Sequence, residues 1–280
     1  MINRRQLLRY GQMSLFAALG TGVASQWQSA DGQTPTESAI EESEATPTTA
    51  EPSQKPNQLS IKWLGHSCFV FAADGLTILV NPFEPIGCTA GYRLPRVQAN
   101  LVLISSQLLD EGSIDELLGK PQILFQPGSY QFRGKQIEGV RTEHDRQGGR
   151  RFGINVTWKW TQAGIKILHL GGVAAPITTN QRILMGRPDL LLLPVGGGPK
   201  AYNAEEAKAA IELLKPKVVI PTLYRTEAAD EDLCDIAGVD EFLSVMENTQ
   251  VEKVNSDAIA LTRDMLPETG PVIKQFQYQF

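Results

Sequence analysis

The sequence predicts an α/β or α+β protein in which two sheets pack together and helices cover them. Short apolar or alternating runs of the strand type recur from residue 59 to residue 262, with few segments of helical spacing between them. The chain has 280 residues and 42% hydrophobic residues, enough to bury a large core without staples. The runs fall into two β-rich halves, each with helices, and such halves bury their apolar faces by stacking as layers.

The first half begins with paired strands around an Asp74-Gly75 turn signal. A continuous apolar run, Leu101 to Ile104, is typical of a strand buried on both faces. Ser113 and Glu116 resemble a capping box, which predicts a short helix from Ser113 to Leu118. The predicted strands of this half lie within residues 59–65, 68–75, 76–83, 100–106, 122–128 and 135–144.

The second half also begins with two predicted strands, which are joined by a turn at Gly164. Asn203 as N-cap, with Glu206 three residues on, predicts a helix to Leu214, which Pro216 stops. A second helix is expected within residues 239–248. The predicted strands lie within residues 155–162, 165–172, 189–198, 217–224, 250–254 and 258–262.

The N-terminal residues carry targeting signals rather than fold signals. Residues 1–27 combine Arg4, Arg5 and Arg9 with a mildly apolar run from Met13 to Ala24, a pattern that resembles a twin-arginine export signal. A short amphipathic or core helix and an uncleaved anchor are the alternatives. Residues 28–58 are rich in Ser, Thr, Pro and Glu, which predicts a disordered linker before a domain spanning residues 59–280.

Export would deliver the mature chain to the periplasm or the cell exterior, or to the thylakoid lumen in a photosynthetic source. No membrane span is expected in that chain. The net charge of -5 argues against nucleic-acid binding. The three cysteines, Cys68, Cys88 and Cys234, show no CxxC spacing, so one pair could bridge in an oxidising compartment and leave one over. The three histidines exclude any mechanism that needs four or five.

The order of these segments resembles the metallo-β-lactamase fold, and is most similar to its ascorbate-6-phosphate-lactonase-like branch of metal-dependent hydrolases. The stretches that carry the resemblance are WLGHSCFVF (63–71), DGLTILVNPF (74–83), ANLVLISS (99–106), VRTEH (140–144), GIKILHLGG (164–172), PDLLLLPVGGG (188–198) and EEAKAAIELLKPKVVIPTLY (205–224). The resemblance implies a four-layer αββα sandwich and a metal site at the ends of its strands.

This sequence departs from the family pattern at the metal ligands. The family loop of histidine, any residue, histidine, any residue, aspartate and histidine corresponds here to Ser106, Leu108, Asp110 and Glu111. His144 matches the third histidine of the first metal. The bridging aspartate corresponds to Gly172, and the histidine of the last strand to Leu223.

These departures predict a vestigial site that holds no metal. Hydrolytic zinc needs about three protein ligands and one open position, where it lowers the pKa of water towards about 7. Leu108, Gly172 and Leu223 offer no side-chain lone pair. The alternative is one zinc or another divalent ion held by Asp110, Glu111 and His144. Otherwise the two acids are loop and helix-start residues, and His144 is a hydrogen-bonded remnant.

Other candidates are weaker. His66 could do acid–base work, although a structural hydrogen bond is the simpler role, and Cys88 could be a nucleophile near it. His169 is most simply a packed strand residue. The glycines Gly196 to Gly198 could approach a phosphate but match no P-loop, which favours a tight turn. The C-terminal KQFQYQF (274–280) predicts an edge strand or a docking tail.

Together these observations predict an exported pseudoenzyme that binds a small molecule or a protein partner, without a cofactor. The first alternative is a hydrolase of the lactone or phosphoester class with a reduced or altered metal site. The second is metal-free hydrolysis with Cys88 or His66.

Overall fold

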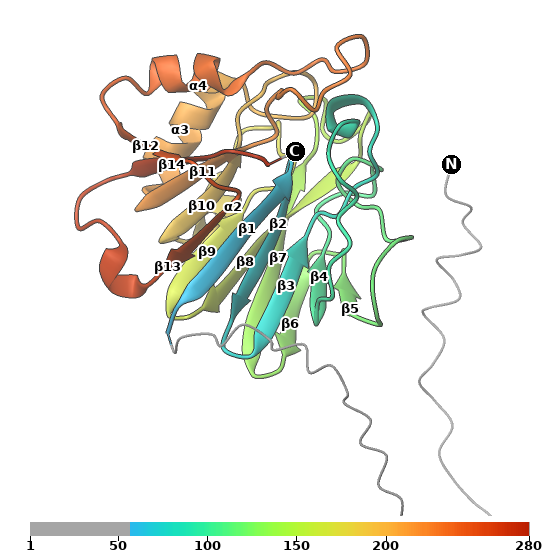
Figure 1. Cartoon of the computed structure of the whole chain (residues 1–280). Helices are drawn as coiled ribbons and strands as arrows, with labels where there is room; N and C mark the ends of the chain where they lie inside the picture. Colours follow the sequence, from blue (N-terminus) through green and yellow to red (C-terminus); the bar gives the residue numbers. More distant parts are fainter. Residues whose placement is uncertain (1–56, 280) are drawn as a thin grey trace, which may run out of the picture. The chain divides into compact units, whose positions relative to one another are not determined.

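Two stacked sheets form the domain in the computed structural model, which describes residues 57–279 (Figure 1). The first sheet has strand order β13-β1-β2-β3-β4-β5. Its strands are β1 (Leu59–Gly65), β2 (Cys68–Ala73), β3 (Leu76–Val80), β4 (Leu101–Leu103), β5 (Gln122–Leu124) and β13 (Ala258–Leu261). The predicted signal peptide and nearly all of the predicted linker lie outside the described residues.

The second sheet has strand order β12-β14-β11-β10-β9-β8-β7-β6. Its strands are β6 (Gly128–Phe132), β7 (Lys135–Glu143), β8 (Ile154–Gln162), β9 (Ile165–His169), β10 (Leu190–Pro194), β11 (Val218–Thr222), β12 (Gln250–Val254) and β14 (Val272–Phe276). Strands β6 to β9 pair antiparallel, whereas β9, β10, β11, β14 and β12 pair parallel. Parallel strands need cover on both faces, and β10 and β11 are accordingly buried along their whole length.

Aromatic side chains hold the two sheets together. The Phe71 and Trp160 rings meet edge to face, with centroids 5.0 Å apart, and both side chains are buried. Trp158 Nε1 donates a hydrogen bond to the Ile104 carbonyl at 3.1 Å. This bond ties the second sheet to the loop that follows β4, and so fixes one wall of the site described below.

Three helices are described: α2 (Thr179–Met185), α3 (Ala204–Leu214) and α4 (Val239–Val245). Figure 1 shows α3 and α4 beside the second sheet. The predicted capping box of α3 is present, because Asn203 accepts from Glu206 N while Glu206 accepts from Asn203 N. Two short 3-10 turns, η1 (Gly87–Thr89) and η2 (Arg263–Met265), complete the elements. The two-sheet α/β sandwich predicted from the sequence is confirmed.

The predicted helix from Ser113 to Leu118 is wrong. The segment forms turns, with one bond from Leu117 N to the Ile114 carbonyl at 3.4 Å. The local capping signal could not support a helix here because Gly119 has φ 75° and Pro121 follows, which leaves too few residues to offset nucleation.

The C-terminal segment is neither an edge strand nor a free tail in the described residues. Strand β14 lies between β12 and β11, inside the second sheet. Tyr278 then packs its ring 4.6 Å from that of Tyr92, and its hydroxyl accepts a hydrogen bond from Arg93 N at 3.0 Å. Phe276 and Tyr278 therefore pack into or against the protein's own core.

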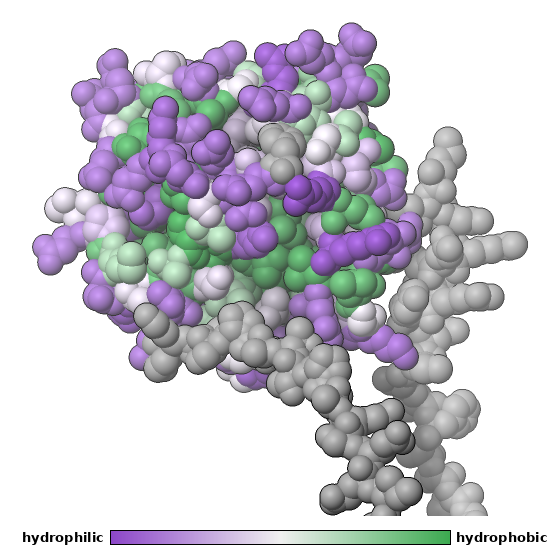
Figure 2. Space-filling model, viewed as in Figure 1, coloured by the Kyte–Doolittle hydropathy of each residue, from purple (hydrophilic) through white to green (hydrophobic). Residues whose placement is uncertain are grey.

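Figure 2 shows hydrophobic residues gathered in the middle of the face that β1 and β2 occupy in Figure 1, framed by hydrophilic ones. Leu64 and Val70 are among the half-buried side chains of these strands. Within residues 57–279, no helix is long and apolar enough to cross a membrane.

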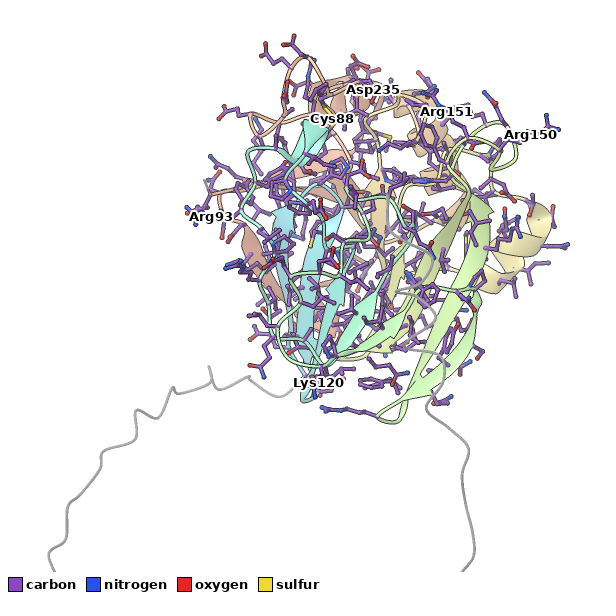
Figure 3. All side chains as sticks on the ribbon, turned by 90° about the vertical axis from the view of Figure 1, so that its right-hand side faces the viewer. Cys88, Arg93, Lys120, Arg150, Arg151 and Asp235 are labelled. Carbon is purple, nitrogen blue, oxygen red and sulfur yellow. A yellow bond between two sulfur atoms is a disulfide. The ribbon has the colours of Figure 1, made fainter. Side chains whose placement is uncertain are left out.

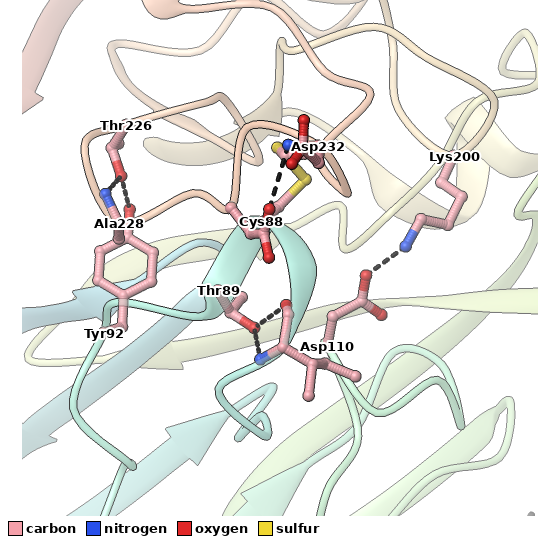
Figure 4. Close-up of a disulfide and its surroundings, with 11 residues drawn as sticks. Cys88, Thr89, Tyr92, Asp110, Lys200, Thr226, Ala228 and Asp232 are labelled. Carbon is pink, nitrogen blue, oxygen red and sulfur yellow. Dashed lines mark hydrogen bonds and ion pairs between the residues drawn. A yellow bond between two sulfur atoms is a disulfide. The ribbon is translucent and has the colours of Figure 1, made fainter.

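A disulfide joins Cys88 in η1 to Cys234, 146 residues further on, and Cys68 remains free and buried (Figure 4). Backbone bonds reinforce the junction: Gly91 N donates to the Ala228 carbonyl at 2.7 Å, and Asp230 N to the Gly87 carbonyl at 2.9 Å. The disulfide therefore fastens the loop after β3 to the loop after β11.

We expect the Cys88→Ser/Cys234→Ser variant to lose about 2–5 kcal/mol of unfolding free energy, because the unfolded chain gains the freedom of a long loop. Urea unfolding with and without reducing agent measures this loss. The Cys68→Ala variant is the control, and its response to reducing agent should match that of the wild type. A wild-type chain whose stability is unchanged by full reduction would contradict the prediction.

Candidate functional site

The candidate site lies where several strands and their following loops end together. Figure 3 shows Cys88 and Asp235 at one end of the molecule and Lys120 at the opposite end, and the site belongs to the Cys88 end. Ligands of open α/β sheets bind outside the carboxyl ends of strands. Contributions come from the turn after β1, the loop after β4, the end of β7, the segment after β9, the loop after β10 and the end of β11.

A buried contact between Glu111 and His144 forms the floor of the site. Both side chains are fully buried, and Glu111 Oε2 lies 3.2 Å from His144 Nε2. Gly172 is packed directly against this pair: a Cβ at this position would overlap His144 Nε2 and lie 2.6 Å from Glu111 Oε1. Three of the sequence-predicted positions thus come together, and a side chain at position 172 is excluded by the other two.

Two buried asparagines hold the loops that carry these residues. Asn155 accepts from Gly172 N at 2.9 Å and donates to the Leu170 carbonyl at 2.7 Å. Asn81 accepts from Ser105 N at 2.8 Å and donates to Ser67 Oγ at 3.3 Å. Asn81 therefore positions the loop after β4 through its side-chain amide.

Asp110 forms an ion pair with Lys200, which follows the glycine turn after β10 (Figure 4). Their side chains are 17% and 20% exposed. Gly197 and Gly198 have φ values of 72° and 67°, the left-handed conformation of a tight turn that glycine adopts without strain. The glycines thus turn the chain so that Lys200 meets the acid of the loop after β4.

Charges within this cluster shift the pKa values of its members. Burial raises the pKa of Glu111, but attraction by His144, Lys200 and His66 outweighs it and lowers the pKa to about 2. Burial lowers the pKa of Lys200, but attraction by Asp110 and Glu111 outweighs it and leaves the pKa raised. Glu111 is thus ionised, and Lys200 charged, at neutral pH.

His66 occupies the turn between β1 and β2 in a left-handed conformation, with φ 52°. Its ring is buried, and neither ring nitrogen has a hydrogen-bond partner among the described residues. Burial lowers the pKa of His66, while Asp110 and Glu111 raise it in part. The His66 carbonyl accepts hydrogen bonds from Trp63 Nε1 at 3.1 Å and from Leu223 N at 3.5 Å. The backbone of His66 therefore links the turn after β1 to the end of β11.

The remaining predicted positions contribute no ligand group. Ser106 Oγ accepts a hydrogen bond from Leu108 N at 3.3 Å, which turns the loop. Leu223 is buried at the end of β11 with φ 51°. A left-handed conformation is a genuine outlier for leucine, which gains no local hydrogen bond from it. Position 223 thus combines this backbone conformation with an apolar side chain.

The residues present do not fit the dinuclear centre that the family resemblance implies. The bridging position is filled by the Glu111–His144 contact, and Asp110 is engaged by Lys200. Within the described part of the chain, no group of three or more His, Cys, Asp or Glu side chains could hold a metal ion. Cys88 is held in the disulfide, where its sulfur is no thiol nucleophile.

His169 forms hydrogen bonds with backbone groups and not with the other side chains of this cluster. Gly171 N donates to its Nδ1 at 3.1 Å, so Nε2 carries the proton and donates to the Ser67 carbonyl at 3.0 Å. Burial lowers the pKa of His169 to about 4. It is a neutral, packed histidine that links β9 to the turn after β1.

Sequence reasoning missed Lys200, Asn155 and Asp145. The Asp145 carboxylate accepts hydrogen bonds from the backbone N–H groups of Gln147, Gly149, Arg151 and Phe152, which hold its pKa at about 2. It fixes the loop beside His144. A lysine two residues after a run of three glycines was the one available signal, since such a turn can present a charge to a site.

Comparison with known proteins first defines the class. A family model described as "Beta-lactamase superfamily domain" matches residues 60–223. A structure from Thermotoga maritima, described as a candidate zinc-dependent hydrolase of the metallo-beta-lactamase superfamily, is 32% identical, with a TM-score of 0.62, and the match covers 78% of this chain and 100% of that one.

Two curated relatives are named UPF0173 metal-dependent hydrolases. The one from Thermus thermophilus is 29% identical over 198 residues, covering 60% of this chain and 84% of its own length. The one from Methanoculleus marisnigri is 26% identical over 220 residues, covering 68% and 90%. The chain belongs to the metallo-β-lactamase superfamily of metal-dependent hydrolases, as its sequence motifs predicted.

We expect Gly172→Ala to cost about 1–3 kcal/mol of stability, because the added methyl group overlaps the buried Glu111–His144 contact. Gly238→Ala is the matched control: its Cβ would meet nothing closer than 3.9 Å, and it should change stability by about 0.5 kcal/mol or less. Chemical unfolding measures both.

The double variant Gly172→Ala/Glu111→Ala should lose less stability than the two single losses added together, because truncating Glu111 makes room for the methyl group. Equal losses for Gly172→Ala and Gly238→Ala would show that position 172 is not held by the contact.

We expect the unfolding free energy to fall as pH drops from about 6.5 to 4, because the unfolded state then protonates His169 and the folded state does not. The full contribution is about 3 kcal/mol, from about 1.4 kcal/mol per pH unit. His169→Gln should flatten this part of the pH profile in urea unfolding. A profile as steep as that of the wild type would contradict the assignment.

Proposed function

We propose that this protein is an exported pseudoenzyme of the superfamily, which binds a small molecule or a protein partner instead of hydrolysing a substrate. The observation that carries the proposal is the packing of Glu111 and His144 against Gly172. A carboxylate that bridges two metals cannot project from position 172 while these two side chains fill that space. The apolar side chains at Leu108 and Leu223 support the same conclusion, since neither offers a lone pair.

Hydrolysis of lactones or phosphoesters with a reduced metal site is the second candidate. The names of the relatives, metal-dependent hydrolases from Thermus thermophilus and Methanoculleus marisnigri, favour it over the pseudoenzyme. In this chain the metal would have to be held by Asp110, Glu111 and His144. The pairing of Asp110 with Lys200 weighs against it. Glu111 and His144 lie 3.2 Å apart, but their side-chain oxygens and nitrogens have no hydrogen-bond partner among the described residues.

Metal-free hydrolysis finds less support. Cys88 would need reduction before it could attack a substrate. His66 is buried, and burial lowers its pKa, but no nucleophile is paired with it in the described residues.

Export to an oxidising compartment forms part of the proposal. The Cys88–Cys234 disulfide supports it, because disulfides persist outside the reducing cytosol and are rare within it. The basic and apolar pattern of residues 1–27 supports it from the sequence. The periplasm, the cell exterior and the thylakoid lumen all satisfy this requirement.

The full chain, purified without a histidine tag, should contain no stoichiometric zinc, manganese or iron by elemental analysis. It should not hydrolyse lactones or phosphodiesters above the uncatalysed rate when any of these three metals is supplied. A stoichiometric metal that disappears in His144→Ala, while remaining in the control His169→Ala, would instead establish the hydrolase. Turnover without metal that is lost in His66→Ala would favour the metal-free alternative.

A further inference from the structure

We propose that Lys200 is the resident cation of this site, where its ammonium group takes the place of a metal ion. The proposal rests on the proposed function and deepens it by naming what balances the acidic charge of the site. The juxtaposition that carries it is the ion pair between Lys200 and Asp110, beside the buried carboxylate of Glu111.

Buried carboxylates need a counter-charge. Glu111 is fully buried, and an ionised carboxylate in such a place is strongly destabilising unless a cation compensates it. His144 contacts Glu111, but Asp110, the next residue along the chain, has Lys200 as its ion-pair partner. The electrostatic attraction of Lys200 reaches both acids. Lys200 thus pairs with one of the two acids and attracts the other.

The loop around Lys200 is fixed on both sides by one guanidinium group. Arg146 donates from Nη1 to the Gly198 carbonyl at 2.9 Å and from Nη2 to the Ala201 carbonyl at 3.0 Å. Arg146 is itself paired with Glu206 at the start of α3. Gly197 N also donates to the Tyr202 carbonyl at 2.8 Å. The loop is thereby held in place, which lowers the entropy cost of fixing a long lysine side chain.

Exposure separates this ion pair from ordinary surface pairs. The pair of Lys135 with Asp74 has side chains 31% and 28% exposed. Among the described lysine pairs, only that of Lys200 with Asp110 has both side chains at 20% exposure or below. Surface pairs contribute about 0–1 kcal/mol, whereas breaking a more buried pair leaves an uncompensated charge.

Lys200→Met tests the assignment, because methionine keeps much of the apolar stem and removes the charge. We expect its melting temperature in the full chain to fall by roughly 4–8 °C. Lys135→Met, which breaks an exposed lysine–aspartate pair, is the matched control and should shift the melting temperature by about 2 °C or less. Excess manganese chloride should raise the melting temperature of Lys200→Met, since a hard cation prefers carboxylate ligands, and leave wild type and control unchanged.

The double variant Asp110→Asn/Lys200→Met keeps the proposal testable if Lys200→Met does not fold. With both charges removed, most of the lost stability should return and the response to manganese should disappear. A Lys200→Met variant as stable as the Lys135→Met control, or a double variant no more stable than Lys200→Met, overturns the assignment and leaves the proposed function standing. Stoichiometric metal in the wild-type chain overturns the proposed function itself.

Discussion

The contact of Glu111 with His144 on the surface of Gly172 is the constraint on which the site depends. All three residues come from different parts of the chain, and none has room to move because the two side chains are fully buried. A side chain at position 172 and this contact exclude each other. Glycine at position 172 therefore leaves the space that the Glu111 and His144 side chains fill.

Two residues of the site have a backbone conformation that is unusual for their type. His66 and Leu223 both take left-handed conformations, and non-glycine residues in this region concentrate at functional positions. Asn155 and Asn81 fix the loops that follow β9 and β4 by side-chain hydrogen bonds. In the same cluster Asp110 is paired with Lys200, and Glu111 contacts His144.

Much of the fold could be predicted from the sequence because its signals are local. The continuous apolar run of β4 and the capping box of α3 are both readable in short stretches. Helix α2 was missed because its Ile183 and Leu184 are exposed, which removes the apolar stripe of a buried helix face. The Lys200–Asp110 pair joins residues 90 positions apart, and the Cys88–Cys234 bridge was one of three pairings that three cysteines allow. The sequence around one member of each pair does not indicate the other member, because the two come together only in the folded chain.

The proposal that Lys200 takes the place of a metal ion beside Asp110 can be tested by direct observation of the site. The most direct measurement is a crystal structure of the full chain grown with excess zinc or manganese, with anomalous difference maps recorded at the absorption edge of the metal. We expect no anomalous peak among Asp110, Glu111 and His144. We expect the Lys200 ammonium group to lie within ion-pair distance of the Asp110 carboxylate. A peak coordinated by these three residues, with Lys200 displaced from Asp110, would contradict it.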